Sequence, residues 1–285
     1  MGHSGKLIIN AALTGMVPEK QDNPHVPITP EEIAADARRC TDAGASILHL
    51  HARDGEGRPS CQAEIYGEIL QRVRDACPDV ILCVSTSGRV HKTFEERSAV
   101  LDDPAVEMAS LTLGSLNFPK QESVNSPEMI RRLALRMRER GILPELEVFE
   151  IGMAEYVHYL LKKDVLATPL YCNILLGNLG TLGASALNLG AAVAALPQST
   201  TWAAAGIGRF QQDVNRMAVE MGGHVRVGLE DNLWLDRERR EPATNVRLIE
   251  RIVEFARSMG RDVATPSESR EIIGIASGEP ARTLA

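Results

Sequence analysis

Two histidines, His49 and His51, are separated by one leucine within the apolar run Ile47–Arg53. Alternate side chains of an extended strand share a face, so both imidazoles would point the same way, about 7 Å apart along the strand. Two imidazoles on one face can converge on a divalent cation. The same spacing also occurs in hydrogen-bonded core histidines, and the pattern alone leaves both interpretations open.

A later run, His224–Asp231, offers a carboxylate that would complete such a site. Alternation places Arg226, Gly228 and Glu230 on one face of this run. A charge inside a fold is costly unless it is paired or bound to a metal, so we expect Glu230 to join His49 and His51 as a metal ligand. The alternative is an ion pair between Glu230 and Arg226.

Two histidines and one glutamate form the ligand set of several catalytic zinc centres that keep an open coordination position. Manganese, cobalt and iron are less favoured alternatives for the same set. The next residue, Asp231, is expected to point away from Glu230 or into the loop, as a free carboxylate available as a base.

Further polar residues lie in or beside the other apolar runs: Ser85, Ser110, Thr112, Glu145, Glu147 and Asn173. Gly114 directly follows the run that contains Ser110 and Thr112. Small hydroxyls at such places often satisfy only loop backbone groups. A glycine-containing segment with Gly206, Gly208 and Arg209 is suited to a phosphate or an extended cofactor, although tight turns explain it equally well.

Eight apolar runs of strand length recur along the chain, each followed by a segment with helical periodicity. The runs are Lys6–Leu13, Ile47–Arg53, Val80–Thr86, Met108–Leu113, Leu146–Glu150, Leu170–Leu176, Thr200–Gly206 and His224–Asp231. Strands that alternate with helices pair in parallel through crossover connections. Eight such units in about 250 residues predict an α/β fold, a (β/α)8 TIM barrel, rather than a doubly wound open sheet.

Helix boundaries support this count. Thr29-Pro30-Glu31-Glu32 predicts a capping box with proline in the first turn, and Ser126-Pro127 opens another helix. A last amphipathic piece, Ser267–Ala276, is an extra C-terminal helix that would cover a barrel end or a neighbouring subunit. Because no linker or low-complexity stretch interrupts the pattern, we expect one catalytic domain over residues 1–285.

The composition disfavours several classes of binding partner. The 285 residues carry a net charge of −7, which gives no electrostatic reason to expect nucleic acid or an anionic membrane. Five cysteines without a Cys-x-x-Cys pair favour reduced thiols and a cytoplasmic protein. No apolar run reaches the roughly 18 residues of a membrane span.

Several stretches together resemble the β-keto acid cleavage enzyme family, in unbroken order from about Leu7 to Ile273. They are Asn10-Ala11-Ala12-Leu13-Thr14-Gly15, Pro27-Ile28-Thr29-Pro30-Glu31-Glu32, Ala43-Gly44-Ala45, His49-Leu50-His51, Ser85-Thr86, Gly114-Ser115-Leu116-Asn117-Phe118, Pro144-Glu145-Leu146-Glu147, Ala205-Gly206-Ile207-Gly208-Arg209 and Gly228-Leu229-Glu230-Asp231-Asn232. The resemblance implies a zinc-dependent (β/α)8 acyltransferase, usually a homotetramer, that converts a β-keto acid and acetyl-CoA into acetoacetate and an acyl-CoA.

The resemblance also implies roles for single residues. His49, His51 and Glu230 match the zinc ligands, Arg226 and Asp231 the catalytic pair, and Glu147 a supporting carboxylate. Ser85 and Ser110 match contacts to the keto acid, and Thr112 and Gly114 lie on the same side. We take Asp231, held by Arg226, as the base that removes a proton from the acetyl-CoA methyl group.

One position departs from the family members that cleave an amino keto acid. Those members carry a glutamate after the first strand that meets the substrate ammonium, and the aligned residue here is Val17. A valine cannot pair with an ammonium group, and Glu19 would replace the glutamate only with a loop shift. We therefore expect a keto acid with a neutral or apolar tail.

Other functions remain as alternatives. A metal-dependent lyase of the HMG-CoA lyase type would use similar metal chemistry without consuming free acetyl-CoA. A metal-dependent hydrolase is disfavoured because that class generally needs more histidines, a carbamylated lysine or a second metal. A catalytically silent barrel that binds a keto acid is the alternative outside enzymes.

Overall fold

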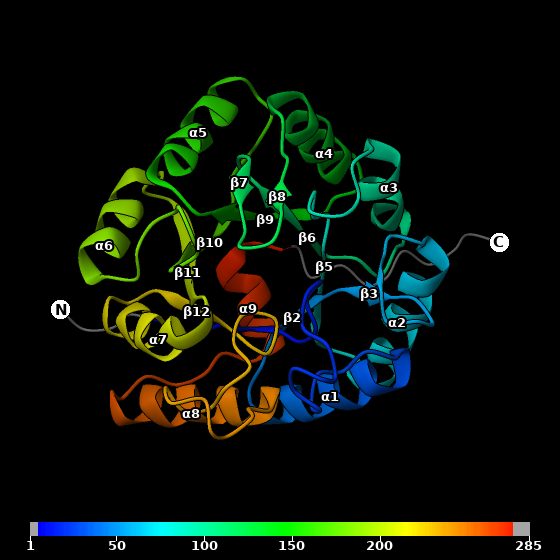
Figure 1. The fold of residues 1–285 in the computed structure, drawn as a ribbon. Coiled ribbons are helices and arrows are strands. Elements are labelled where there is room, and N and C mark those ends of the chain that lie inside the picture. Colours follow the sequence, from blue (N-terminus) through cyan, green and yellow to red (C-terminus); the bar gives the residue numbers. More distant parts are fainter. Residues whose placement is uncertain (1–4, 276–285) are drawn as a thin grey trace.

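The computed structural model describes residues 5–275 and contains a closed, parallel, eight-stranded barrel surrounded by helices (Figure 1). Around the barrel the strands follow the order β1-β12-β11-β10-β9-β6-β5-β2. Their bounds are β1 Ile9–Ala12, β2 Ile47–Leu50, β5 Ile81–Val84, β6 Met108–Thr112, β9 Leu143–Val148, β10 Leu170–Leu176, β11 Thr200–Gly206 and β12 His224–Val227. The predicted (β/α)8 barrel is confirmed.

Helices connect successive barrel strands and cover their outer faces (Figure 1). They are α1 Pro30–Ala43, α2 Ala63–Ala76, α3 Phe94–Ser98 with η1 Ala99–Asp102, α4 Pro127–Glu139, α5 Ile151–Lys162, α6 Ala186–Ala195, η2 Gly208–Phe210 with α7 Gln211–Glu220, and α8 Asn245–Ser258. The capping box predicted at Thr29 is present, and the Ser126 side chain accepts from the Met129 N–H.

Only β10 and β11 have the predicted bounds, and three of the other six strands differ in an informative way. The run Ile47–Arg53 is not one strand, because β2 ends at Leu50 and Ala52–Arg53 forms β3, which pairs with β4, Pro59–Ser60. β12 ends at Val227, because Gly228 adopts a φ of 155° that turns the chain. β9 begins three residues earlier than predicted, since the polar residues at its start face the barrel interior.

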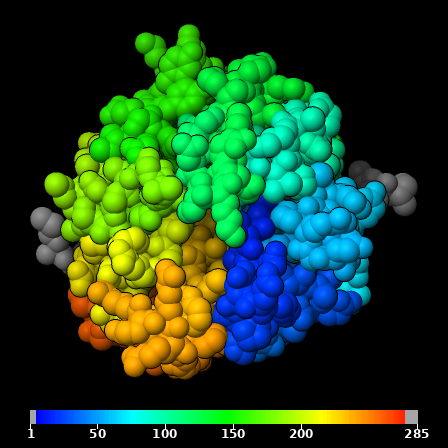
Figure 2. Space-filling view, in the orientation of Figure 1, coloured from blue at the N-terminus to red at the C-terminus, as the bar shows by residue number. Residues whose placement is uncertain are grey.

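Loops and two short hairpins lie at the end of the barrel where the strands terminate. One hairpin is β3–β4, and the other is β7 Leu116–Asn117 with β8 Glu122–Ser123. Figure 2 shows the segment after β6 reaching over the centre of this face toward the segment that follows β1. These segments form the rim of the site described below.

The opposite end of the barrel is closed by α9, Pro266–Ile273, which crosses the centre of the strand ring in Figure 1. Ile273 packs with Ile8, Ile47, Ile81 and Met108, all fully buried near the beginnings of strands. The predicted extra helix therefore covers a barrel end, and its predicted last residue, 276, lies outside the described residues. Within residues 5–275, no helix is both long and apolar enough to cross a membrane.

Candidate active site

A cavity of about 610 Å³ opens at the carboxyl ends of the barrel strands. Its floor carries charged and polar side chains: His49, His51, Ser85, Thr112, Glu147, Arg226, Glu230 and Asp231. Its rim comes from the segments after β1 and β6 and is largely apolar, with Val17, Leu116 and Phe118. Active sites of such barrels lie at this end.

His49, His51 and Glu230 come together at the floor of the cavity. The two Nε2 atoms are 3.2 Å apart, and Glu230 lies with Oε1 3.2 Å from His51 Nε2 and Oε2 3.7 Å from His49 Nε2. Ligand atoms bound to one tetrahedral zinc ion are separated by about 3.3 Å, given metal–nitrogen bonds near 2.05 Å.

One carboxylate oxygen of Glu230 is free to bind a cation. Its Oε2 atom is buried without a hydrogen-bond partner among the described residues. A buried carboxylate oxygen without a hydrogen-bond partner destabilises the fold unless a ligand such as a metal ion binds it. The donor set of two imidazoles and one carboxylate therefore fits a divalent metal ion.

Glu145 orients His49 by contacting its Nδ1, the ring nitrogen directed away from the other metal-ligand candidates. Its Oε2 lies 2.7 Å from His49 Nδ1, while its Oε1 accepts hydrogen bonds from the side chains of Asn10 at 2.6 Å and Asn173 at 2.7 Å. With the ring proton directed to Glu145, Nε2 of His49 presents its lone pair to the ligand cluster. Burial lowers the pKa of His51, which favours the neutral, metal-binding imidazole.

Arg226 is the common partner of three carboxylates. Its Nε donates to Asp231 at 3.0 Å, its Nη2 to Glu230 at 2.8 Å, and its Nη1 to Glu147 at 3.3 Å. Asp231 is therefore not the free carboxylate that strand alternation predicted, because the turn at Gly228 brings it back to the same guanidinium. The ion pair between Arg226 and Glu230, the alternative to metal binding, is present together with the ligand cluster.

Burial and neighbouring charges together shift the pKa values of these carboxylates in different directions. Burial raises the pKa of Asp231, and the negative charge of Glu230 adds to this effect, although Arg226 opposes it. Burial likewise raises the pKa of Glu147, whose Oε2 accepts from the Thr112 hydroxyl at 2.6 Å. For Glu230 the charges of His51 and Arg226 outweigh burial and hold its pKa well below the ordinary value. A carboxylate with a raised pKa is a better proton acceptor near neutral pH.

The residues predicted to bind substrate divide into two groups. Val17, Ser85 and Thr112 line the cavity. Ser110 is buried beside it, with its hydroxyl oxygen accepting from the Thr86 N–H at 3.0 Å. Gly114 is packed against Met153 and does not line the cavity.

The three residues predicted to bind a cofactor lie just outside the cavity. Gly206 packs against the backbone of Phe210, where an added Cβ would come within 2.4 Å of the carbonyl oxygen. Gly208 donates its N–H to the carbonyl oxygen of Asp231 at 2.6 Å. Arg209 lines a separate, arginine-rich pocket.

Other placements were not expected from the sequence. Arg53, predicted on the face of the two histidines, instead donates to the carbonyls of Gly15 and Pro18 and braces the loop after β1. Arg89 lines the cavity, with its guanidinium carbon 3.5 Å from the centre of the Phe118 ring. An isolated arginine in a loop carries no sequence signal that would have singled it out.

Comparisons with known proteins identify the family of the chain. The model of the beta-keto acid cleavage enzyme family matches residues 6–275. The 3-keto-5-aminohexanoate cleavage enzyme of Fusobacterium nucleatum is 40% identical over 271 residues, or 95% of this chain and 98% of that protein. The 3-oxoadipate:acetyl-CoA acetyltransferase of Cupriavidus necator is 34% identical over 275 residues, covering 95% and 96% respectively.

Among solved structures, the apo structure of ObcA is similar with a TM-score of 0.75. The match has 22% sequence identity and covers 88% of this chain and 66% of the ObcA chain. At this identity the similarity concerns the fold, which agrees with the closed barrel described above.

Proposed function

The chain belongs to the beta-keto acid cleavage enzyme family, and we propose that it is a zinc-dependent transferase that converts a β-keto acid and acetyl-CoA into acetoacetate and an acyl-CoA. One observation carries the proposal. The three residues that fit a metal ion, His49, His51 and Glu230, share one cavity with Asp231, and the Arg226 guanidinium contacts both Glu230 and Asp231. A Lewis acid and a base beside one another are what carbon–carbon cleavage of a keto acid requires.

His49, His51 and Glu230 would hold the ion, and zinc is our choice because it favours nitrogen-rich sites with an open position. A divalent ion bound there supplies Lewis-acid polarisation of a substrate carbonyl. Glu145 serves this site by fixing the ring of His49.

Atom balance decides which carbon loses its proton. A carbanion formed on the acetyl-CoA methyl group and added to the 3-keto carbon would give a branched adduct, and cleavage of that adduct would release acetate. A carbanion at C2 of the keto acid, attacking the thioester carbonyl, instead expels the CoA thiolate. Return of the thiolate to the original 3-keto carbon then breaks the C2–C3 bond and yields acetoacetate and acyl-CoA.

The proton that Asp231 removes is therefore assigned to C2 of the keto acid, which corrects the acetyl-CoA methyl assignment made from the sequence. The raised pKa of Asp231 suits it to accept this proton. Arg226 holds the carboxylate in place, and the same proton returns to the acetoacetate carbon after cleavage. Glu147 supports Arg226 from β9.

Ser85 and Thr112 are proposed to contact the keto acid, because both line the cavity floor. Ser110 and Gly114 would act through their neighbours, Ser110 through Thr86 and Gly114 through Asn125, whose side chain donates to the Gly114 carbonyl. A neutral or apolar substrate tail is supported by Val17 at the rim. Glu19 also lines the cavity, without the loop shift expected from the sequence, and its carboxylate accepts from Gln21 at 2.6 Å. The homotetramer and the cytoplasmic location stay predictions.

The test is an assay of acetoacetate and acyl-CoA with purified protein, acetyl-CoA and a panel of 3-oxoacids with neutral, acidic and basic tails. Each reaction is run with and without a zinc chelator. Acetoacetate formation that needs both acetyl-CoA and metal supports the proposal. Cleavage without consumption of acetyl-CoA would indicate a lyase, and absence of product from metal-loaded protein across the panel would contradict catalysis of this type.

A further inference from the structure

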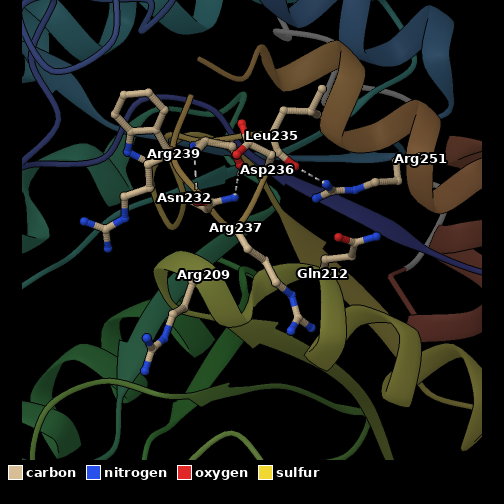
Figure 3. Close-up of a pocket in the computed structure, with 9 residues that line it drawn as sticks. Arg209, Gln212, Asn232, Leu235, Asp236, Arg237, Arg239 and Arg251 are labelled. Atoms are coloured by element: carbon tan, nitrogen blue, oxygen red, sulfur yellow. Dashed lines mark hydrogen bonds between the residues drawn. The ribbon is translucent and has the colours of Figure 1, made fainter. Parts of the chain in front are cut away.

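A second concave site lies at the same end of the barrel and is lined by arginine side chains from three segments (Figure 3). Arg209 follows β11, Arg237 and Arg239 belong to the loop after β12, and Arg251 lies on α8. Gln212, Asn232, Trp234, Leu235 and Asp236 complete the lining. We call these nine residues the arginine pocket.

Several cations of the arginine pocket lack an opposite charge. Arg237 pairs with Asp213, and the carboxylate of Asp236 is engaged with Arg240 outside the pocket. Arg209, Arg239 and Arg251 form no ion pair within residues 5–275. Three uncompensated guanidiniums around one depression favour an anion, and their planar donors suit phosphate oxygens.

Arg251 adds a second indication of an absent ligand. One of its terminal nitrogens donates to the Leu235 carbonyl at 2.8 Å, while its Nε is buried without a partner among the described residues. Burial lowers the pKa of Arg251, and the like charges of Arg216 and Arg247 lower it further. An anion in the pocket would relieve the repulsion between these like charges.

The arginine pocket and the active-site cavity are separated by a thin wall. Ile207 and Asp231 line the cavity, whereas Arg209 and Asn232, each one or two residues further along the chain, line the arginine pocket. The wall is closed by the hydrogen bond from Gly208 to Asp231. β11 and β12 are the seventh and eighth barrel strands, and the loops after these strands are where barrels often bind phosphate.

We propose that coenzyme A lies across this shallow pocket, whose enclosed volume is only about 10 Å³, with its phosphate groups on the arginines at the rim, so that its pantetheine arm passes over the wall at Gly208 and places the thioester beside Asp231. This inference rests on the proposed function, which requires acetyl-CoA as co-substrate. Trp234 lines the same pocket and offers an aromatic face on which the adenine can stack.

The test compares binding rather than turnover. The double variant Arg209→Gln with Arg239→Gln removes two exposed charges that have no ion pair among the described residues. Arg257→Gln is the matched control, because Arg257 is an exposed arginine of α8 that does not line the pocket. Calorimetry measures the dissociation constants of CoA, pantetheine and inorganic phosphate for the wild-type protein and both variants.

We expect the double variant to bind CoA at least about tenfold more weakly, since each lost charge-assisted contact is worth about 1.5 kcal/mol or more. Pantetheine affinity should not change, and Arg257→Gln should behave as wild type. Equal CoA affinity in wild type and double variant would overturn the arginine pocket while leaving the transferase proposal intact. A wild-type protein that binds phosphate but not CoA would overturn both proposals, because acetyl-CoA could then not be its co-substrate.

Discussion

The Arg226 guanidinium is almost fully buried and contacts both Glu230, a proposed metal ligand, and Asp231, the predicted base. Its rigid fork presents donors in fixed directions, so Glu230 and Asp231 are held relative to each other by one planar group. A lysine at this position would offer a point charge without that geometry. The position of Asp231 is thus determined by the same residue that neutralises it.

Asp231→Asn tests the base directly. The amide keeps an oxygen that can accept from Arg226 but cannot take a proton, so we expect kcat to fall by about 10²- to 10⁴-fold with bound metal unchanged. Steady-state kinetics and metal analysis of the same preparation measure both quantities. The same substitution at the exposed Asp75 of α2 is the control. Wild-type kcat in Asp231→Asn would refute the assignment of the base.

Glu145→Gln tests the support of His49. Removing the charge behind Nδ1 makes the imidazole a weaker ligand, and we expect metal affinity to fall by about 10- to 100-fold. Competition with a chromogenic chelator measures this affinity. Glu147→Gln is the matched control, because it lies two residues along β9 and contacts Thr112 and Arg226 instead of His49. Similar losses in both variants would mean that the effect is not specific to His49.

Val17→Glu tests the tail preference. An introduced carboxylate at the cavity rim should raise kcat/KM for a keto acid with an amino tail and lower it for an apolar tail. Val17→Gln, of similar size but uncharged, separates charge from volume. The comparison uses matched pairs of substrates that differ only in the terminal group. A wild-type enzyme that already prefers the amino substrate would contradict the proposed neutral tail.

The sequence predicted contacts between site residues that lie close together along the chain. His49 and His51 lie two residues apart, and Arg226 and Glu230 lie four apart, so periodicity alone suggests that they share a side. The contact of Glu145 with His49 joins β9 to β2, which are not neighbours in the barrel. A contact across the interior depends on the closure and register of the whole barrel, which no local pattern contains.

At the scale of the elements, the predicted strands agree best where apolar residues run without interruption, as in β10 and β11, whose bounds are as predicted. Polar residues that face the interior obscured the start of β9. The end of β12 was missed for a different reason, since strand alternation cannot show that Gly228 leaves the extended conformation.

Gly228 is predicted to be essential for placing Glu230. A Cβ at this residue would lie 2.1 Å from the Ala12 carbonyl oxygen, which accepts the Glu230 N–H at 3.2 Å. Gly228→Ala should therefore destabilise the fold by about 2 to 5 kcal/mol and weaken metal binding. Urea denaturation and chelator competition provide the two measurements.

The control for Gly228→Ala is Gly222→Ala. Gly222 also has a positive φ, 82°, but a Cβ there would meet nothing within 4 Å. We expect this variant to lose about 1 to 2 kcal/mol from backbone strain alone and to keep its metal affinity. Equal metal affinity in both variants would show that the turn does not position Glu230.

At the scale of the whole molecule, the two ends of the barrel are chemically different. The end covered by α9 is filled with apolar residues, whereas the other end holds the charged cavity. The sequence predicted the barrel and the extra helix but left open what that helix covers. Its amphipathic pattern shows that one face is buried, while the surface that buries it is set by the path of the whole chain.

Without a bound ion, the cavity contains more acidic than basic side chains. Glu145, Glu147, Glu230 and Asp231 supply four acidic groups around the guanidinium of Arg226, and Arg89 is a second arginine that lines the cavity. Four carboxylates against two guanidiniums leave a formal excess of two negative charges, which a divalent cation would offset. Buried charge that is not balanced destabilises a fold, so metal binding and folding should be linked.

We therefore expect metal to stabilise the whole barrel. Saturating zinc at about 100 times its dissociation constant should add about 2.7 kcal/mol, which for a chain of this length corresponds to roughly 5 to 10 °C in Tm. Calorimetric scans of chelated protein with zinc, manganese, cobalt or ferrous iron added back measure the shift and rank the metals. His51→Ala removes one ligand and should abolish most of the shift, while the exposed His158 of α5 offers a matched alanine control. An unchanged Tm on chelation, with metal loss verified, would contradict the charge argument, and an equal shift in His51→Ala would place the metal elsewhere.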